Sequence, residues 1–325
     1  MQCIISVILF LFCSIFGVSG GLAFWENNLL YEGESIYNYL QVKETENSVI
    51  LSTNVLFGVQ SIMKKDDSLT GMYYDYALAG PVMSGIATKE NAKILVLGMG
   101  TGTYAKQCQK YFTNASIEGI EIDQKITDLA SKYFQLPDSV KVTTYDGRAY
   151  LNATNQKYDV IMVDAYQDIT IPFQMSSVEF FTMVKNHLTK DGIMVVNMNM
   201  RTEKKENINQ YLSDTIANIF DVVYTVNVDG ATNRELFATQ NMEVAKTFAQ
   251  NTMKLDNSEL KKLMHNVASN MEIYRKGEYL LTDDKAPVEL LGMRVIDELI
   301  QDEISHYKEV FEAEGVNGLL KDILF

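Results

Sequence analysis

A glycine-rich turn offers the first residues that could do chemistry. Gly98, Gly100, Thr101 and Gly102 follow an apolar run, ILVL, that has the character of a strand, and a helical pattern begins directly after them. Glycines let the backbone turn tightly and approach a ligand, and free amides at a helix N-terminus favour an anionic group. The same pattern also occurs in tight connections that bind nothing, so the turn alone is a weak signal.

Three carboxylates extend this pattern downstream. Glu121 in GIEID, Asp146 in YDGRAYL and Asp164 in VIMVDAYQ each end an apolar run. A carboxylate about twenty residues after the turn can accept both ribose hydroxyls, and another can accept from an adenine amino group. Each acid, taken singly, also fits a solvated helix cap. Because the carboxyl ends of parallel strands meet in one crevice, the set predicts a nucleotide site, which also includes Gly147.

The spacing of the turn separates two kinds of nucleotide. It reads G-x-G-x-G rather than the full G-x-G-x-x-G of dinucleotide sites, and Asp146 and Asp164 have no required part in binding NAD. An adenosyl nucleotide of the S-adenosylmethionine kind, used as the donor in a group transfer, fits better. No metal is expected, since His187, His265 and His306 lie far apart in the sequence without cysteines or carboxylates at ligand spacing.

The elements that must position these residues form an α/β pattern. From Lys93 onward short apolar runs alternate with helical segments, which is typical of a doubly wound Rossmann-like sheet. A hairpin follows, formed by VVYTVNV and ELFAT. Strands are predicted at 94–98, 116–122, 140–145, 160–164 and 192–199, and helices at 104–112, 125–134, 178–187, 203–220 and 294–311.

A different pattern precedes this domain. The segments IYNYLQVKE, SVILSTN and VLFGVQSIM are rich in β-branched and aromatic residues and are separated by polar breaks, which predicts a small antiparallel β module. The predicted organisation is therefore a membrane anchor or signal segment at 1–25, an N-terminal β module at 26–88, and a Rossmann-like nucleotide-binding transferase domain at 89–325.

The N-terminal segment is apolar and uncharged. Its core, IISVILFLFCSIF, favours a single membrane anchor with Trp25 at the interface. A signal peptide with its small residues at Val18, Ser19 and Gly20 is the alternative, although the basic start of such peptides is missing. A buried core helix is the third interpretation. The expected location is thus at a membrane, or outside the cell if the segment is cleaved.

The net charge of the chain limits the classes of molecule that it is expected to bind, and its cysteine content limits the disulfides that it can form. The net charge of −14 argues against nucleic acid and favours a cationic small molecule such as a polyamine, although acidity for solubility alone explains it as well. Only Cys108 lies in the globular part, so no disulfide is expected within it. The expected partners are a small-molecule amine, the membrane through the N-terminal segment, and a second copy in a homodimer.

Several motifs in sequence order resemble the spermidine synthase family of polyamine aminopropyltransferases, and especially its membrane-fused bacterial relatives. The resemblance covers nearly all of the chain after the N-terminal segment. It rests on the glycine turn, GIEID, YDGRAYL, FGVQS at 57–61, TGMYYDYALAGP at 70–81, VDAYQDITIPFQMSSVEFF at 162–181 and LTDDKAPVEL at 281–290. The family implies a Rossmann-like fold with a small N-terminal β module, and decarboxylated S-adenosylmethionine as the donor.

The resemblance also implies roles for matching residues. Gln60 contacts the nucleoside, Glu121 the ribose and Asp146 the adenine. Asp164 orients and deprotonates the attacking amine, which must lose a proton before it can attack a carbon next to a sulfonium. Tyr74 packs along the hydrocarbon chain of the amine, and simple core packing is its alternative role.

Departures from the family pattern put the substrate in doubt. An aspartate usually stands inside the glycine turn to bind the donor's amino group, and Thr101 replaces it. Gln167 replaces a second aspartate three residues after the catalytic one, and Asp75-Tyr76 replaces the usual His/Gln-Glu pair. Carboxylates and polar side chains expected near the amine are Tyr166, Gln167, Asp168, Asp283 and Asp284.

Three functions remain open from the sequence. The first is aminopropyl transfer from decarboxylated S-adenosylmethionine to a polyamine amine, favoured by the order of the motifs and by Asp164. Methyl transfer from S-adenosylmethionine is the second, because it uses the same nucleoside contacts and needs no acidic clamp for a diamine. A membrane-tethered domain that binds the nucleotide without catalysis is the third.

Overall fold

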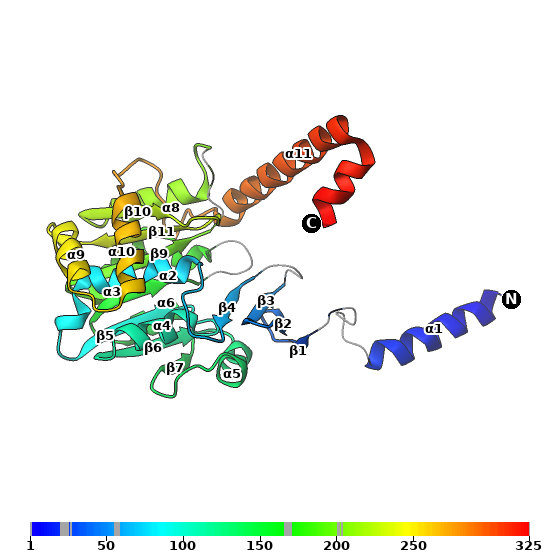
Figure 1. Cartoon of the computed structure of the whole chain (residues 1–325), viewed down its shortest axis with the longest axis horizontal. Helices are drawn as coiled ribbons and strands as arrows, with labels where there is room; N and C mark the ends of the chain where they lie inside the picture. Colours follow the sequence, from blue (N-terminus) through cyan, green and yellow to red (C-terminus); the bar gives the residue numbers. More distant parts are fainter. Residues whose placement is uncertain are drawn as a thin grey trace.

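The computed structural model describes residues 2–19, 26, 28–54, 59–165, 171–199, 202 and 204–324. Its largest part is a mixed α/β domain built on one central sheet, beside a separate antiparallel sheet near the N-terminus (Figure 1). The predicted fold class is therefore confirmed.

The central sheet runs in the order β12-β10-β11-β9-β8-β5-β6-β7. Strands β7, β6, β5, β8 and β9 are parallel, and β11 joins β9 in antiparallel fashion. The chain order reverses between β5 and β8, which is the switch point where open α/β sheets bind ligands. The strands are β5 (Ala92–Leu97), β6 (Ala115–Glu121), β7 (Lys141–Thr144), β8 (Tyr158–Val163), β9 (Leu188–Met198), β10 (Val222–Asn227), β11 (Arg234–Thr239) and β12 (Glu272–Ile273).

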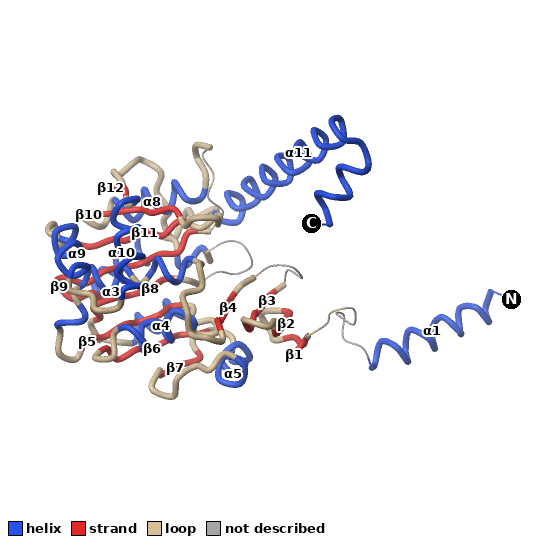
Figure 2. Tube along the Cα trace, in the orientation of Figure 1, coloured by secondary structure: helices blue, strands red, loops and turns tan. Residues whose placement is uncertain are grey.

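Helices cover both faces of this sheet (Figure 2). One apolar core lies under α2 (Tyr73–Ala77), α3 (Ala79–Ser84), α4 (Thr103–Tyr111), α9 (Val244–Met253) and α10 (Ser258–Asn270). The other lies under α6 (Gly147–Ala153), α7 (Val178–His187), α8 (Ile208–Ala217) and the start of α11 (Val288–Leu324). Strands covered on both faces read as continuous apolar runs, and β8 is buried at every position. Helices α2, α3, α6, α9 and α10 were not predicted from the sequence.

The N-terminal β module is a four-stranded antiparallel sheet. It consists of β1 (Leu29–Glu34), β2 (Tyr39–Glu44), β3 (Ser48–Thr53) and β4 (Ser61–Lys64). Its apolar side chains pack on α5 (Gln124–Tyr133), so the module is fixed to the nucleotide-binding domain. Helices α2 and α3 pack on the central sheet although they precede the predicted boundary near residue 88. The division into domains at that residue stays a prediction.

The N-terminal segment forms helix α1 (Gln2–Ser19), which projects from the body of the molecule (Figure 1). Among the described residues, no helix is long and apolar enough to cross a membrane. The predicted membrane anchorage, and the location built on it, are therefore wrong. Trp25 and Gly20 lie outside the described residues.

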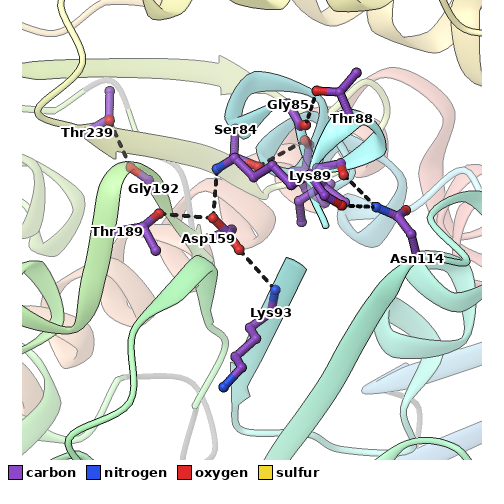
Figure 3. A network of polar contacts seen from close by, with 12 residues as sticks. Ser84, Gly85, Thr88, Lys89, Lys93, Asn114, Asp159, Thr189, Gly192 and Thr239 are labelled. Carbon is purple, nitrogen blue, oxygen red and sulfur yellow. Dashed lines mark hydrogen bonds and ion pairs between the residues drawn. The ribbon is translucent and has the colours of Figure 1, made fainter. Parts of the chain in front are cut away.

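A polar network ties the three central strands together at the amino end of β8 (Figure 3). The Asp159 carboxylate accepts hydrogen bonds from Lys89 Nζ at 2.7 Å, from the Lys93 amide at 3.0 Å and from Thr189 Oγ1 at 3.0 Å. These partners come from the start of β5, the loop before it and β9. The network fixes the relative positions of the strands whose other ends carry the site.

Candidate active site

A cavity of about 320 Å³ opens at the carboxyl ends of β5, β6 and β8. The switch point forms its floor, and residues around β4 of the β module and tyrosines of α2 complete its wall. The structure brings eight of the predicted site residues together there: Gln60, Tyr74, Gly98, Gly100, Glu121, Asp146, Gly147 and Asp164.

The glycine turn requires glycine for two reasons. Gly98, Gly100 and Gly102 have φ values of 84°, 55° and 83°, in the left-handed region that favours glycine. A Cβ on Gly98 would also lie 2.4 Å from the carbonyl oxygen of Asp164. The turn therefore passes directly over the end of β8, and a larger residue at 98 would push the two strand ends apart.

Glu121 is held by main-chain amides. Its Oε2 accepts from the Gly100 amide at 2.8 Å, and its Oε1 accepts from the Asp123 amide at 3.0 Å. Burial raises the pKa of Glu121, and these two hydrogen bonds act in the opposite direction. The carboxylate thus links the end of β6 to the glycine turn and faces the cavity at a fixed orientation.

Asp146 caps a helix and lines the cavity at the same time. Its Oδ1 accepts from the Ala149 amide at 2.7 Å, which makes it the N-cap of α6. Gly147, the first residue of that helix, lines the cavity next to it. The helix cap and the ligand contact are therefore compatible roles for one carboxylate.

Asp164 follows β8 and is held by side chains. Tyr73 donates its hydroxyl hydrogen to Oδ2 at 2.6 Å, and Asn197 Nδ2 donates to Oδ1 at 2.9 Å. Burial raises the pKa of Asp164 to about 7, although both hydrogen bonds lower it; the negative charge of Glu121 raises it further. A carboxylate with this pKa changes its protonation state near neutral pH, as a general base must.

Tyr73 and Asn197 are partners that the sequence analysis missed. Tyr74 was predicted instead of Tyr73, but its hydroxyl donates to the Gln60 carbonyl at 2.8 Å. The two tyrosine rings lie 4.0 Å apart, so both belong to the same wall of the site. Asn197 stands near the carboxyl end of the predicted strand 192–199, where a polar residue in an apolar run was the available signal.

Other predicted residues lie elsewhere. Thr101 is buried, with its Oγ1 3.3 Å from that of Thr103, and neither it nor Gly102 is among the described residues that line the cavity. Asp283 pairs with both terminal nitrogens of Arg148, at 2.7 and 2.6 Å, and the exposed Asp284 adjoins it. Neither aspartate lines the cavity as described. Tyr166, Gln167 and Asp168 lie outside the described residues.

A further carboxyl group is buried behind Asp164. Glu235 stands opposite Asn197 in the ladder between β9 and β11 and is fully buried. Among the residues that the structure describes, neither of its carboxylate oxygens has a hydrogen-bond partner. Burial raises the pKa of Glu235 well above its usual range, and the negative charge of Asp164 adds to this. The ionised form of Glu235 is therefore strongly disfavoured next to the Asp164 carboxylate.

This arrangement defines the class of protein. The glycine turn and the carboxylates on successive strand ends are typical of sites that bind an adenosyl nucleotide, and Asp164 lines the same cavity. Among the described residues, no group of histidine, cysteine and carboxylate side chains could hold a metal ion. The fold and site are those of a Rossmann-like transferase.

Comparisons with known proteins give the family. Residues 74–230 match the spermine/spermidine synthase domain. A probable polyamine aminopropyl transferase of Bifidobacterium longum is 52% identical over 340 residues, covering 99% of this chain and 75% of that protein. The chain therefore belongs to the spermine/spermidine synthase family, which confirms the predicted family and a transferase.

Solved structures agree with this fold. A probable spermidine synthase from Corynebacterium glutamicum superposes with a TM-score of 0.58 at 17% identity, covering 76% of this chain and 96% of that one. A spermidine synthase in complex with the transition-state analogue AdoDATO gives a TM-score of 0.55 at 17% identity, covering 71% of this chain and 79% of that one. At these identities the likeness supports the fold alone.

Proposed function

We propose that this protein transfers an aminopropyl group from decarboxylated S-adenosylmethionine to an amine nitrogen of a polyamine. The observation that carries the proposal is the Asp164 carboxylate, set at the switch point of the sheet inside the cavity and held by Tyr73 and Asn197. Membership of the spermine/spermidine synthase family supports the same reaction.

The chemistry requires a group that both holds a cation and accepts a proton. An ammonium has no lone pair, so the amine must lose a proton to attack the propyl carbon attached to the sulfonium. As the new C–N bond forms, the C–S bond breaks and the sulfur leaves as a neutral thioether. Asp164, ionised, attracts the ammonium and takes its proton, and correct positioning supplies much of the acceleration.

The nucleoside side of the cavity comprises the glycine turn, Gln60, Glu121 and Asp146. In this proposal Glu121 accepts from the ribose hydroxyls, Asp146 from the adenine amino group, and Gln60 contacts the nucleoside. Both carboxylates are already oriented by main-chain amides, so binding the donor requires little reordering.

The amine side of the cavity comprises Asp164, Tyr73, Tyr74 and Asn197. Tyr73 and Tyr74 offer ring faces along which the hydrocarbon chain of a polyamine can lie. The net charge of −14 favours the approach of a polycation. Tyr166, Gln167, Asp283 and Asp284 stay predictions as residues that bind the amine, and a homodimer stays a prediction as well.

Methyl transfer is the second candidate, because of the glycine turn. Thr101 stands where the family usually has an aspartate for the donor's amino group, and it is buried away from the cavity. No carboxylate of the turn therefore selects between a donor with and one without its own carboxyl group.

The test is a titration of the full chain with S-adenosylmethionine, its decarboxylated form and methylthioadenosine in parallel, followed by mass spectrometry of the amine product. Aminopropyl transfer predicts tighter binding of the decarboxylated donor and a product heavier by one aminopropyl unit. Preference for the intact donor together with a methylated product would replace this proposal with methyl transfer.

A further inference from the structure

Helix α11 carries a stripe of exposed apolar side chains. Leu290, Met293, Ile300, Ile304 and Phe311 are between 49% and 65% exposed. Asp297 and Tyr307 fill the gaps in their spacing, so the stripe advances by alternate steps of three and four residues. Such spacing is the a and d pattern of a coiled coil, sustained here over three heptads.

The opposite face of the helix is already used. Val288, Leu291 and Val295 are buried in the core shared with α8, which fixes the first turns of α11 to the domain. The helix then extends away from the body of the molecule (Figure 1). The stripe therefore faces outward while the helix itself is firmly attached, and 22 residues from Leu290 to Phe311 span about 33 Å.

We propose that α11 pairs with α11 of a second copy of this chain in a parallel two-stranded coiled coil. The charges that flank the stripe select this partner and this direction. Glu289 stands at a g position and Arg294 at the following e position, and both are exposed. In a parallel pair each g residue faces the e residue five positions later on the other helix, so these charges attract.

An antiparallel pair would bring like charges together. It places e opposite e and g opposite g, so that Arg294 and Lys308 of one helix would face the same cations of the other. In the sequence, Glu303 and Lys308 repeat the spacing of Glu289 and Arg294. Two turns of the helix thus favour the parallel direction for the same reason.

Asp297 limits the strength of the pair. It occupies an a position, where the parallel arrangement brings the two copies of this residue face to face. A single polar residue at such a position fixes register and costs stability. A reversible dimer follows, in which the two domains lie side by side at the base of the coiled coil.

Helix α1 of the same molecule is the alternative partner for the apolar stripe of α11. It also exposes apolar side chains, among them Ile8, Phe10 and Phe12. However, α1 contains no charged residue, so it offers no partner for Glu289 or Arg294. Charge complementarity therefore favours a second α11.

The first test is sedimentation of the full chain over a range of concentrations. The wild-type chain is expected to dimerise reversibly. Ile304→Asp is expected to raise the dissociation constant at least about 100-fold, because it would bury one new negative charge on each helix opposite its copy on the other. Ser305→Asp adds the same charge next to it but outside the stripe, and leaves the constant unchanged. A chain that is monomeric throughout, or a dimer indifferent to Ile304→Asp, would overturn the proposal.

The second test fixes the direction and the partner. In a parallel pair d residues face each other, so an Ile300→Cys variant is expected to form a disulfide with its own copy, identified by mass spectrometry of the linked peptides. A disulfide between residue 300 and Cys13, which is exposed on α1, would overturn the proposal. Glu289→Lys should weaken the dimer and Glu289→Lys with Arg294→Glu should restore it; failure of the double variant to recover contradicts the parallel direction.

Discussion

On the nucleoside side of the cavity main-chain amides hold the carboxylates, whereas on the amine side other side chains do. Glu121 accepts from the amides of Gly100 and Asp123, and Asp146 from that of Ala149. Asp164 accepts instead from Tyr73 on α2 and from Asn197 on β9.

The nucleoside side of the cavity is therefore rigid, whereas on the amine side the pKa of the carboxylate can be changed by substitution. Main-chain amides are fixed by the fold and stay in place whichever side chain the residue carries. They therefore orient the carboxylates of the nucleoside side, and a side-chain substitution at the donor residue does not remove the hydrogen bond that sets the pKa of the carboxylate. Side-chain partners can be replaced one at a time, and each replacement changes the pKa of Asp164. We therefore expect the amine side to control the rate of the proposed reaction, and the following substitutions test that division.

The largest effect is expected from Asp164→Asn. Removing the general base should lower the rate of transfer by about 10²–10⁴-fold while changing the affinity for the donor less than about threefold. Steady-state rates and isothermal titration of the same preparation measure both. A parallel loss of donor affinity would place Asp164 on the nucleoside side and erase the distinction.

Glu121→Ala should act on the opposite half. Loss of a charged hydrogen-bond acceptor costs about 1.5–3 kcal/mol, so the donor should bind about 10–150-fold more weakly. Glu121→Gln keeps one acceptor oxygen for the Gly100 amide and is the matched control, expected to lose less. Unchanged affinity in Glu121→Ala would remove this residue from the site.

Tyr73→Phe should shift the pH dependence of the reaction. Without the hydroxyl donor the charged form of Asp164 loses a stabilising hydrogen bond, so its pKa rises and the ascending limb of kcat/KM moves to higher pH by about one unit. Tyr74→Phe is the control and is expected to shift the limb less, because that hydroxyl bonds to the Gln60 carbonyl and reaches Asp164 only through Tyr73. Equal shifts in both variants would mean that the hydrogen bond from Tyr73 to Asp164 does not cause the shift.

Glu235→Met should change stability rather than activity. This buried carboxyl has no hydrogen-bond partner among the described residues, so replacing it by an apolar side chain of similar size should raise the free energy of unfolding by about 1–3 kcal/mol. Because its folded pKa is raised, Glu235 costs more stability as the pH rises, so the gain should be larger at pH 8 than at pH 5. Glu235→Gln retains a buried polar group and should gain less in urea unfolding. A destabilised Glu235→Met would indicate that the carboxyl has a favourable partner.

The sequence predicted which strand ends meet at the cavity. The glycine turn, Glu121, Asp146 and Asp164 each follow a strand and lie at one edge of the sheet, so strand order and spacing sufficed. Tyr73 and Asp164 are 91 residues apart, and their contact depends on how α2 packs on the sheet, which no local pattern encodes. For the same reason the choice of Tyr74 over its neighbour could not be settled from residue type.

The most direct test of the account is the pH dependence of kcat/KM for the wild-type chain between pH 5 and 9. The free enzyme must carry Asp164 ionised, so the account predicts a rate that rises with pH and levels off above a pKa of about 7. Asp164→Asn should abolish this limb. A wild-type profile that is flat over the range, or a limb that persists in Asp164→Asn, would contradict the assignment of Asp164 as the base.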